Sequence, residues 1–262
     1  MTRYKLEIEY IGQNYAGSQK QSGEVNTIQD EIEKALRTLT KEYTKTIFSG
    51  RTDAGVNAVG QVLHFDFNKT LVASKFINSM NGLLPDDISA KYIEEVSDDF
   101  HAQKSARWRW YRYCIINRTQ RSAFDGQNLL VRKRLNLDNI ICALKHLEGE
   151  HDFSAFKSVG TGVPSDICNI LYTNANRDGD KIFIDIVGSR FLYNMVRTIV
   201  GTILMLEKDG LKPELIKSIL ESKDRKNAGP TISPNGLTFM KVGYEDWTEY
   251  TKKEIINGDK RI

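Results

Sequence analysis

The sequence lacks the residue clusters from which proteins build disulfide frameworks and metal cages. Its 262 residues contain three cysteines, none of them in a CxxC pair: Cys114, Cys142 and Cys168. Each has apolar neighbours, so we expect small buried side chains in a chain that stays reduced, as in the cytoplasm. The four histidines form no i, i+4 pair, and no glycine-rich phosphate-binding motif is followed by a lysine. The sequence therefore predicts no metal and no nucleotide cofactor.

Long apolar runs are also missing. The longest, Phe191–Leu206, is interrupted by Asn194 and Arg197 and is too short to span a bilayer. The first residues contain no apolar core of the kind found in signal peptides. Hydrophobic residues make up 40% of the chain and charged residues 27%, which excludes wholesale disorder, collagen and coiled coil. We therefore expect a globular protein with no membrane segment.

Charge is distributed unevenly, although the net charge is only +3. Residues 1–103 carry 11 Lys and Arg against 15 Asp and Glu, which gives −4. Residues 104–134 carry nine against one, which gives +8. A basic block this dense indicates a polyanion as partner, although a solvated strand and loop has the same composition.

Hydrophobic periodicity predicts strands and helices in two similar passages. In the first passage we expect strands at Lys5–Tyr10, Thr46–Ser49, Gln61–Phe67 and Ile88–Val96, and helices at Thr27–Leu39 and Ser74–Asn81. In the second we expect strands at Arg107–Ile116, Lys181–Val187 and Thr238–Tyr244, and helices at Asp138–Leu147, stopped by Gly149, and Leu192–Glu207. This order predicts an α+β fold with two α+β subdomains, residues 1–105 and 106–246, and a polar tail at 247–262. One arrangement that fits is a single sheet shared by the two subdomains.

The segment Ser49–Ala58 is the first candidate for chemistry. A strand leads into two glycines that bracket Arg51, Thr52 and Asp53. Glycines allow the backbone to approach a ligand closely, and a short loop at a strand end can present a cation and a carboxylate to one cleft. The alternative is a structural turn in which Asp53 bonds to its own backbone.

Two further segments carry candidates. In Arg107–Tyr113, period-2 alternation places Arg107, Arg109, Tyr111 and Tyr113 on one face, where guanidinium groups suit phosphates and aromatic rings suit unstacked bases. Trp108 and Trp110 fall on the other face, where we expect core packing. In Phe191–Arg197, Arg197 lies off the apolar stripe, where an arginine side chain is usually exposed to solvent.

Taken together, these segments resemble the tRNA pseudouridine synthase A (TruA) family from Tyr10 to Tyr244. The resemblance rests on segments that occur in the family's order: Tyr10–Gly17, Thr27–Gln29, Gly50–Val56, Leu84–Ile88, Phe100–Ala102, Arg109–Tyr113, Gly149–Phe153, Phe191–Arg197 and Gly236–Leu237. Gly50–Val56 is the most specific of them. The chain departs from the family at Ser18, Asn57 and Gln103, where the family usually has Trp, His and Arg, and at Ser233, where it usually has Ala.

The resemblance implies the pseudouridine synthase fold, in which two α+β halves surround a central, mostly antiparallel sheet with flanking helices. It implies a cofactor-free, homodimeric isomerase that converts uridine to pseudouridine at positions 38, 39 and 40 of the tRNA anticodon stem-loop. In that family the residue at Asp53 is catalytic and the one at Arg51 helps to displace the base. Tyr111 would stack on the flipped uracil, Arg197 would pair with Asp53, and Leu237 would form an aliphatic wall.

The chemistry fits these residue types. A uridine in or beside a stem must be extruded into a pocket, and a carboxylate in a dry pocket needs a nearby guanidinium to stay ionised. The sequence leaves two routes open, in which the carboxylate attacks the ribose or removes a ribose proton. It also leaves two other functions open: a pseudouridine synthase acting on another RNA, and a non-catalytic RNA-binding protein.

Overall fold

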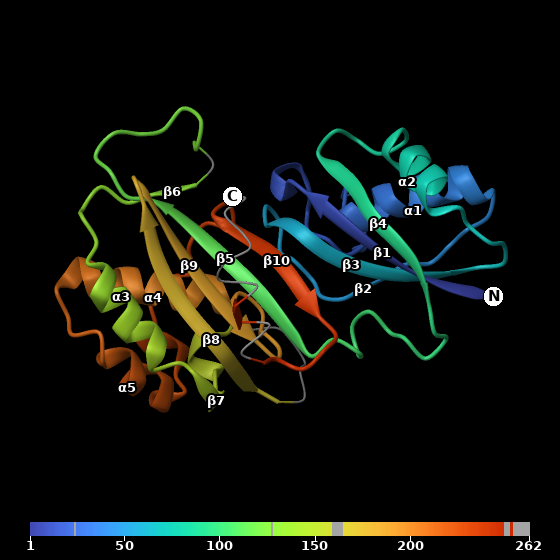
Figure 1. The fold of residues 1–262 in the computed structure, drawn as a ribbon. Helices are drawn as coiled ribbons and strands as arrows, with labels where there is room; N and C mark the ends of the chain where they lie inside the picture. Colours follow the sequence, from blue (N-terminus) through green and yellow to red (C-terminus); the bar gives the residue numbers. More distant parts are fainter. Residues whose placement is uncertain (24, 127, 159–164, 249–251, 254–262) are drawn as a thin grey trace.

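The computed structural model describes residues 1–23, 25–126, 128–158, 165–248 and 252–253 (Figure 1). The strands are β1 (Thr2–Tyr10), β2 (Ile47–Phe48), β3 (Asn57–Phe67), β4 (Ile88–Val96), β5 (Trp108–Ile116), β6 (Leu129–Leu130), β7 (Gly149–Asp152), β8 (Ile167–Asp178), β9 (Lys181–Gly188) and β10 (Leu237–Gly243). The helices are α1 (Ile28–Thr40), α2 (Ala73–Asn81), α3 (Leu137–Lys145), α4 (Met195–Asp209) and α5 (Leu215–Ser222), with short 3₁₀ turns at Gly12–Asn14, Ser154–Phe156 and Arg225–Asn227.

All ten of these strands form one sheet, in the order β4-β1-β3-β10-β5-β9-β8-β7, with β2 beside β3 and β6 beside β5. Pairing is antiparallel except between β10 and β3 and between β5 and β6. The last strand, β10, lies between β3 of the first half and β5 of the second (Figure 1). This confirms the α+β prediction and the shared sheet. The subdomain limits at residues 105 and 246 stay predictions.

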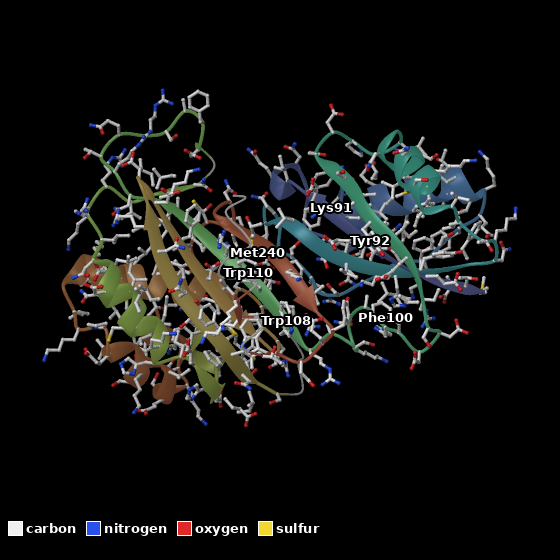
Figure 2. All side chains as sticks on the ribbon, viewed as in Figure 1. Lys91, Tyr92, Phe100, Trp108, Trp110 and Met240 are labelled. Atoms are coloured by element: carbon white, nitrogen blue, oxygen red, sulfur yellow. The ribbon has the colours of Figure 1, made fainter. Side chains whose placement is uncertain are left out.

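Alternation along β5 divides its side chains between the two faces of the sheet. Tyr111, Tyr113 and Ile115 belong to the main core, to which all five helices contribute buried residues. Trp108 and Trp110 are buried in a smaller cluster with Val187 and Met240 (Figure 2). The expected packing of both tryptophans is therefore confirmed, and the face that holds Tyr111 is the one that the helices cover.

The start of the predicted polar tail packs against this smaller cluster. The ring of Trp247 lies 5.3 Å from that of Trp108 in an edge-to-face arrangement, and the Lys252 ammonium lies 5.6 Å from the centre of the Tyr172 ring. These contacts hold the chain after β10 on the sheet. Residues 249–251 and 254–262 of the predicted tail lie outside the described residues.

Several predicted boundaries were wrong. Gly149 does not stop α3, which ends at Lys145; with φ +101° it begins β7 instead. The helix expected from Leu192 begins at Met195, and β3 begins at Asn57, four residues before the predicted start. Strands β7 and β8 and helix α5 were not predicted at all. Of the three cysteines, Cys142 is only partly buried.

Candidate active site

The loop between β2 and β3 carries Asp53, and buried polar groups from the start of the chain hold it. The Thr52 amide donates to Ser18 Oγ at 2.8 Å, and the Ser18 amide donates to the Thr52 carbonyl at 3.0 Å. The hydroxyls of Tyr10 and Thr52 share a hydrogen bond of 2.8 Å. Ser18, Thr52 and Tyr10 are all buried, so three hydrogen bonds fix Thr52, the residue before Asp53. Ser18, a departure from the family, therefore supports the loop.

Two glycines of the same N-terminal segment allow this close packing. A Cβ at Gly12 would lie 2.1 Å from the Val56 carbonyl oxygen, and one at Gly17 would lie 2.8 Å from the Thr52 carbonyl oxygen. The Gly12 amide also donates to Asn57 Oδ1 at 2.9 Å. Asn57, a second departure from the family, therefore also supports this loop. Any larger residue at Gly12 would push the Asp53 loop away.

The Asp53 carboxylate pairs with Arg197, which comes from the opposite half of the chain. Arg197 Nη1 donates to Asp53 Oδ2 at 3.2 Å, and the two side chains are 15% and 22% exposed. The Asp53 carbonyl accepts from the Val56 amide at 3.1 Å, but its carboxylate makes no bond to its own backbone. The turn-only interpretation of Asp53 is therefore wrong, and so is the expectation that solvent surrounds Arg197.

Burial and charge act in opposite directions on Asp53. Burial raises the pKa of its carboxyl above the usual value, and the Arg197 guanidinium partly offsets that rise. A half-buried carboxylate beside one cation can act as a nucleophile or as a base once it is ionised.

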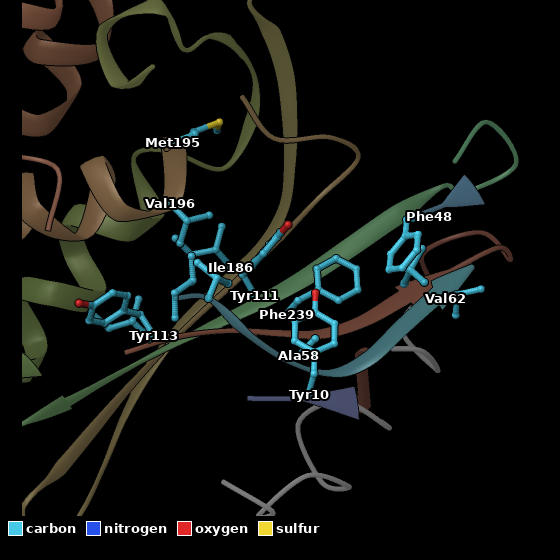
Figure 3. Close-up of a cluster of buried hydrophobic side chains, with 14 of the residues drawn as sticks. Tyr10, Phe48, Ala58, Val62, Tyr111, Tyr113, Ile186, Met195, Val196 and Phe239 are labelled. Carbon is cyan, nitrogen blue, oxygen red and sulfur yellow. The ribbon is translucent and has the colours of Figure 1, made fainter. Parts of the chain in front are cut away.

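Tyr111 packs in the core behind this pair. It is 9% exposed, and its ring makes edge-to-face contacts with Phe191 and Phe239, each at 5.0 Å. Figure 3 labels Tyr111 and Phe239 in this cluster. Burial, then the nearby Tyr10 and Asp53, raises the pKa of Tyr111. Its hydroxyl therefore keeps its proton at neutral pH and remains available as a donor near Asp53.

The remaining two predicted site residues differ in their surroundings. Leu237 is buried at the start of β10 and its amide donates to the Pro234 carbonyl at 2.8 Å. Pro234 borders the Asp53 loop, since a Cβ at Gly55 would lie 3.0 Å from its side chain. Arg51 is exposed and bonds to no residue that the structure describes. The structure thus brings Asp53 and Arg197 into contact, and leaves Arg51 free to reach a ligand.

The basic block at residues 104–134 is only partly available to a polyanion. Arg112 is buried and pairs with Asp185 at 2.9 Å. Arg109 donates to four carbonyls, those of Ser49, Gln103, Ala106 and Ser189. Arg118 binds Asp180 and the carbonyls of Gln120 and Arg121. Six cations are exposed, but Arg107 pairs with Asp246 at 2.6 Å and Lys133 donates to the carbonyls of Glu207 and Lys208. The exposed cations with no side-chain partner among the described residues are Lys104, Arg121, Arg132 and Arg134. The expectation that the whole block faces a polyanion was therefore wrong for Arg109 and Arg112.

Sequence reasoning assigned no positioning role to Arg109 or Asn194. Arg109 ties the carbonyl of Ser49, at the start of the Asp53 loop, to the end of β9 through Ser189. Asn194 Oδ1 accepts from Arg197 Nη1 at 2.7 Å. The only sequence signal for either residue was its place inside a family motif, because carbonyl acceptors leave no trace in a sequence.

The described residues contain no group of three or more His, Cys, Asp or Glu side chains that could hold a metal ion. Within the same ranges, no helix is both long and apolar enough to cross a membrane.

Comparison with known proteins gives consistent matches along the chain. A family model described as tRNA pseudouridine synthase matches residues 7–103 and 143–245, one segment in each half. A tRNA pseudouridine synthase A of Clostridium acetobutylicum is 41% identical over 246 residues, which cover 93% of this chain and all of the relative. The protein of the same name from Buchnera aphidicola subsp. Schizaphis graminum is 42% identical over 92% of both chains, and that of Colwellia psychrerythraea is 37% identical over 97% of this chain and 98% of its own.

Proposed function

This chain belongs to the tRNA pseudouridine synthase A family, and we propose that it isomerises uridine to pseudouridine at positions 38, 39 and 40 of the tRNA anticodon stem-loop, with Asp53 as the catalytic carboxylate. The observation that carries the site assignment is the Asp53–Arg197 pair at 3.2 Å. It joins the two halves of the chain, and each residue lies in a segment that resembles the family. Members of this family are intramolecular isomerases, so no atom of the substrate is lost and no group is transferred.

The reaction breaks the C1′–N1 bond of uridine, turns the uracil, and forms a C1′–C5 bond. The proton on C5 leaves and N1 gains one, so atoms and electrons balance without a redox partner. The Asp53 carboxylate either adds to C1′ or removes a ribose proton to give a glycal. Both routes require ionised Asp53, which the cation of Arg197 favours.

The other site residues have roles that follow from their positions. Arg51 is exposed and unpaired among the described residues, so it can enter the space that an extruded nucleotide leaves, while its charge contacts phosphate. Tyr111 and Leu237, both buried, would provide an aromatic ring and an aliphatic wall that restrain the free uracil as it turns. Burial of the bound uracil against these side chains would also keep water from hydrolysing the intermediate.

The partners of the protein follow from the same proposal. The exposed cations between Lys104 and Arg134 are where the tRNA backbone would lie. We also propose a homodimer, the state that the family resemblance implies, and a cytoplasmic location, where tRNA is present and free thiols stay reduced.

The experiment uses purified protein with a tRNA transcript labelled with tritium at C5 of uridine. Release of tritium should stop only when positions 38, 39 and 40 are all cytidine, because C5 loses its hydrogen when the new bond forms. Equal release from an unrelated structured RNA would favour a synthase with another substrate. Tight binding without release would favour a non-catalytic RNA-binding protein and contradict the proposal.

A further inference from the structure

Asn194 has an unusual backbone for its place in the fold. Among the described residues, three that are not glycine have positive φ: Lys41, Asn194 and Lys223. Lys41 and Lys223 follow the last residues of α1 and α5, where the left-handed conformation is common. Asn194 instead precedes the first residue of α4, with φ 61° and ψ 7°. Residues at that position are usually extended, so a local requirement must favour this conformation.

The Asn194 side chain does not cap its helix. Thr27 and Asn136, which precede α1 and α3, are extended and accept hydrogen bonds from amides of the first turn. Asn194 makes no such bond, although asparagine is among the best capping residues. Its side chain therefore has another use, and its unusual backbone conformation accompanies that use.

The amide group of Asn194 is bonded at both ends. Its Oδ1 accepts from Arg197 Nη1 at 2.7 Å, and its Nδ2 donates to Ser158 Oγ at 2.8 Å. Because the second bond uses the donor end of the amide, it turns the acceptor end toward Arg197. Asn194 lies just before α4 and Arg197 lies in its first turn, so the bond joins the start of the helix to the residue that precedes it.

Arg197 is held by three acceptors, of which the catalytic carboxylate is the most distant. Arg197 Nε donates to the Ile232 carbonyl at 2.8 Å, while Nη1 donates to Asn194 at 2.7 Å and to Asp53 at 3.2 Å. The two neutral oxygens fix the guanidinium in position but carry no charge. The positive charge therefore acts chiefly on Asp53, since a second carboxylate at either place would compete for it.

We propose that Asn194 is a positioning residue for the isomerisation, whose neutral amide holds the Arg197 guanidinium against Asp53 and whose left-handed backbone aims the amide there. This inference rests on the proposed catalytic role of Asp53. The other titratable groups that interact with the pair are Tyr111, near Asp53, and Tyr113, near Arg197, and both stay neutral in the working pH range because burial raises their pKa values.

Three substitutions separate the backbone of Asn194 from its amide. Asn194→Gly keeps the left-handed backbone at no steric cost and removes the amide. We expect Asn194→Gly to lower the Tm only by the loss of the two amide hydrogen bonds, to lower kcat about tenfold, and to leave KM for tRNA within about twofold, because an arginine held at two points instead of three spends less time against Asp53. Asn194→Ala should lower kcat similarly and lower the Tm further, because alanine disfavours positive φ.

Asn194→Asp tests the charge. A carboxylate on Arg197 Nη1 competes for the guanidinium and repels the Asp53 charge, so the acid limb of the kcat/KM profile should move up by about one pH unit. Lys41→Gly is the matched control, because Lys41 is a left-handed residue remote from the site: its Tm should stay or rise and its kinetics should not change.

Full kcat in Asn194→Gly would show that the asparagine serves the backbone alone and would overturn the inference. So would an acid limb in Asn194→Asp that coincides with that of the unsubstituted protein. If the unsubstituted protein had no isomerase activity, the proposed function would fail, but NMR titration of the Asp53 carboxyl would still test the inference. An Asp53 pKa that is higher in Asn194→Asp and in Asn194→Gly supports it, and an unchanged pKa contradicts it.

Discussion

Raising the salt concentration should weaken tRNA binding by an amount that depends on how many lysine and arginine side chains are free to contact phosphate. Of the nine cations between Lys104 and Arg134, five are bound to carbonyls or carboxylates: Arg107, Arg109, Arg112, Arg118 and Lys133. The other four, Lys104, Arg121, Arg132 and Arg134, are exposed and have no side-chain partner among the described residues. Each phosphate contact contributes roughly 0.7 to 0.9 to the slope of log K against log salt. Four contacts therefore give a slope between about −3 and −4, whereas nine would give about −6 to −8. Between 50 and 200 mM salt, the affinity should fall on the order of 100-fold.

Filter binding of one tRNA transcript at several KCl concentrations measures this slope. Arg121→Gln removes an exposed cation with no partner among the described residues, so it should make the slope shallower by about one contact and weaken binding to all tRNAs equally. The control is Arg37→Gln, an exposed arginine on α1 outside the block, which should leave the slope unchanged.

Two outcomes would refute this reasoning. If Arg121→Gln and the corresponding variants of Arg132 and Arg134 changed neither affinity nor slope, the block would be a solvated surface and the RNA would cross the protein elsewhere. A slope near −8 would require Arg112 to reach phosphate, which contradicts its buried pairing with Asp185.

The remaining predictions concern His64, Tyr111 and metal. Burial lowers the pKa of His64 to about 4, and its Nδ1 accepts from the Ala102 amide. The unfolding free energy should therefore be highest above pH 6.5 and fall by up to about 3 kcal/mol as the pH drops toward 4; urea unfolding of His64→Gln should show a flatter pH dependence, and an identical one would contradict us. Tyr111→Phe keeps the ring between Phe191 and Phe239, so Tm and tRNA affinity should survive; a loss of affinity above tenfold would mean that the hydroxyl itself binds RNA. Activity on a pre-folded stem-loop should persist in excess chelator, and full inhibition that zinc reverses would refute the metal-free chemistry.

Strands with strong alternation could be predicted from sequence because their burial pattern is local. Ile88–Val96 was predicted with both ends correct, and the helix expected at Thr27–Leu39 lies at Ile28–Thr40, one residue further along at each end. Strand β8 was missed because a register shift between Ile170 and Tyr172 breaks its alternation in two, and Asn174 and Asn176 disfavour a strand; pairing with β9 and β7 stabilises it. Tertiary contacts of that kind override the intrinsic preferences of the residues.

The site was predictable only in part, for a related reason. The glycine-bracketed Asp53 loop was visible in the sequence, and the family resemblance paired it with Arg197. The groups that position both residues could not be inferred, because Ser18, Arg109 and Asn194 act through backbone carbonyls, amides and single side-chain atoms that only the fold brings together. An arginine off an apolar stripe gave no local sign that it would be buried.

The most direct test of the central claim is the turnover of Asp53→Asn beside its affinity for tRNA. Asparagine keeps an oxygen for Arg197 and removes a charge whose burial raises the Asp53 pKa, so we expect the fold to remain stable. We predict that Asp53→Asn and Asp53→Ala form no pseudouridine on a tRNA transcript while their affinity stays within tenfold, about 1.4 kcal/mol, of the unsubstituted protein. Pseudouridine formation near the unsubstituted rate in Asp53→Asn would contradict the assignment of Asp53 as the catalytic carboxylate.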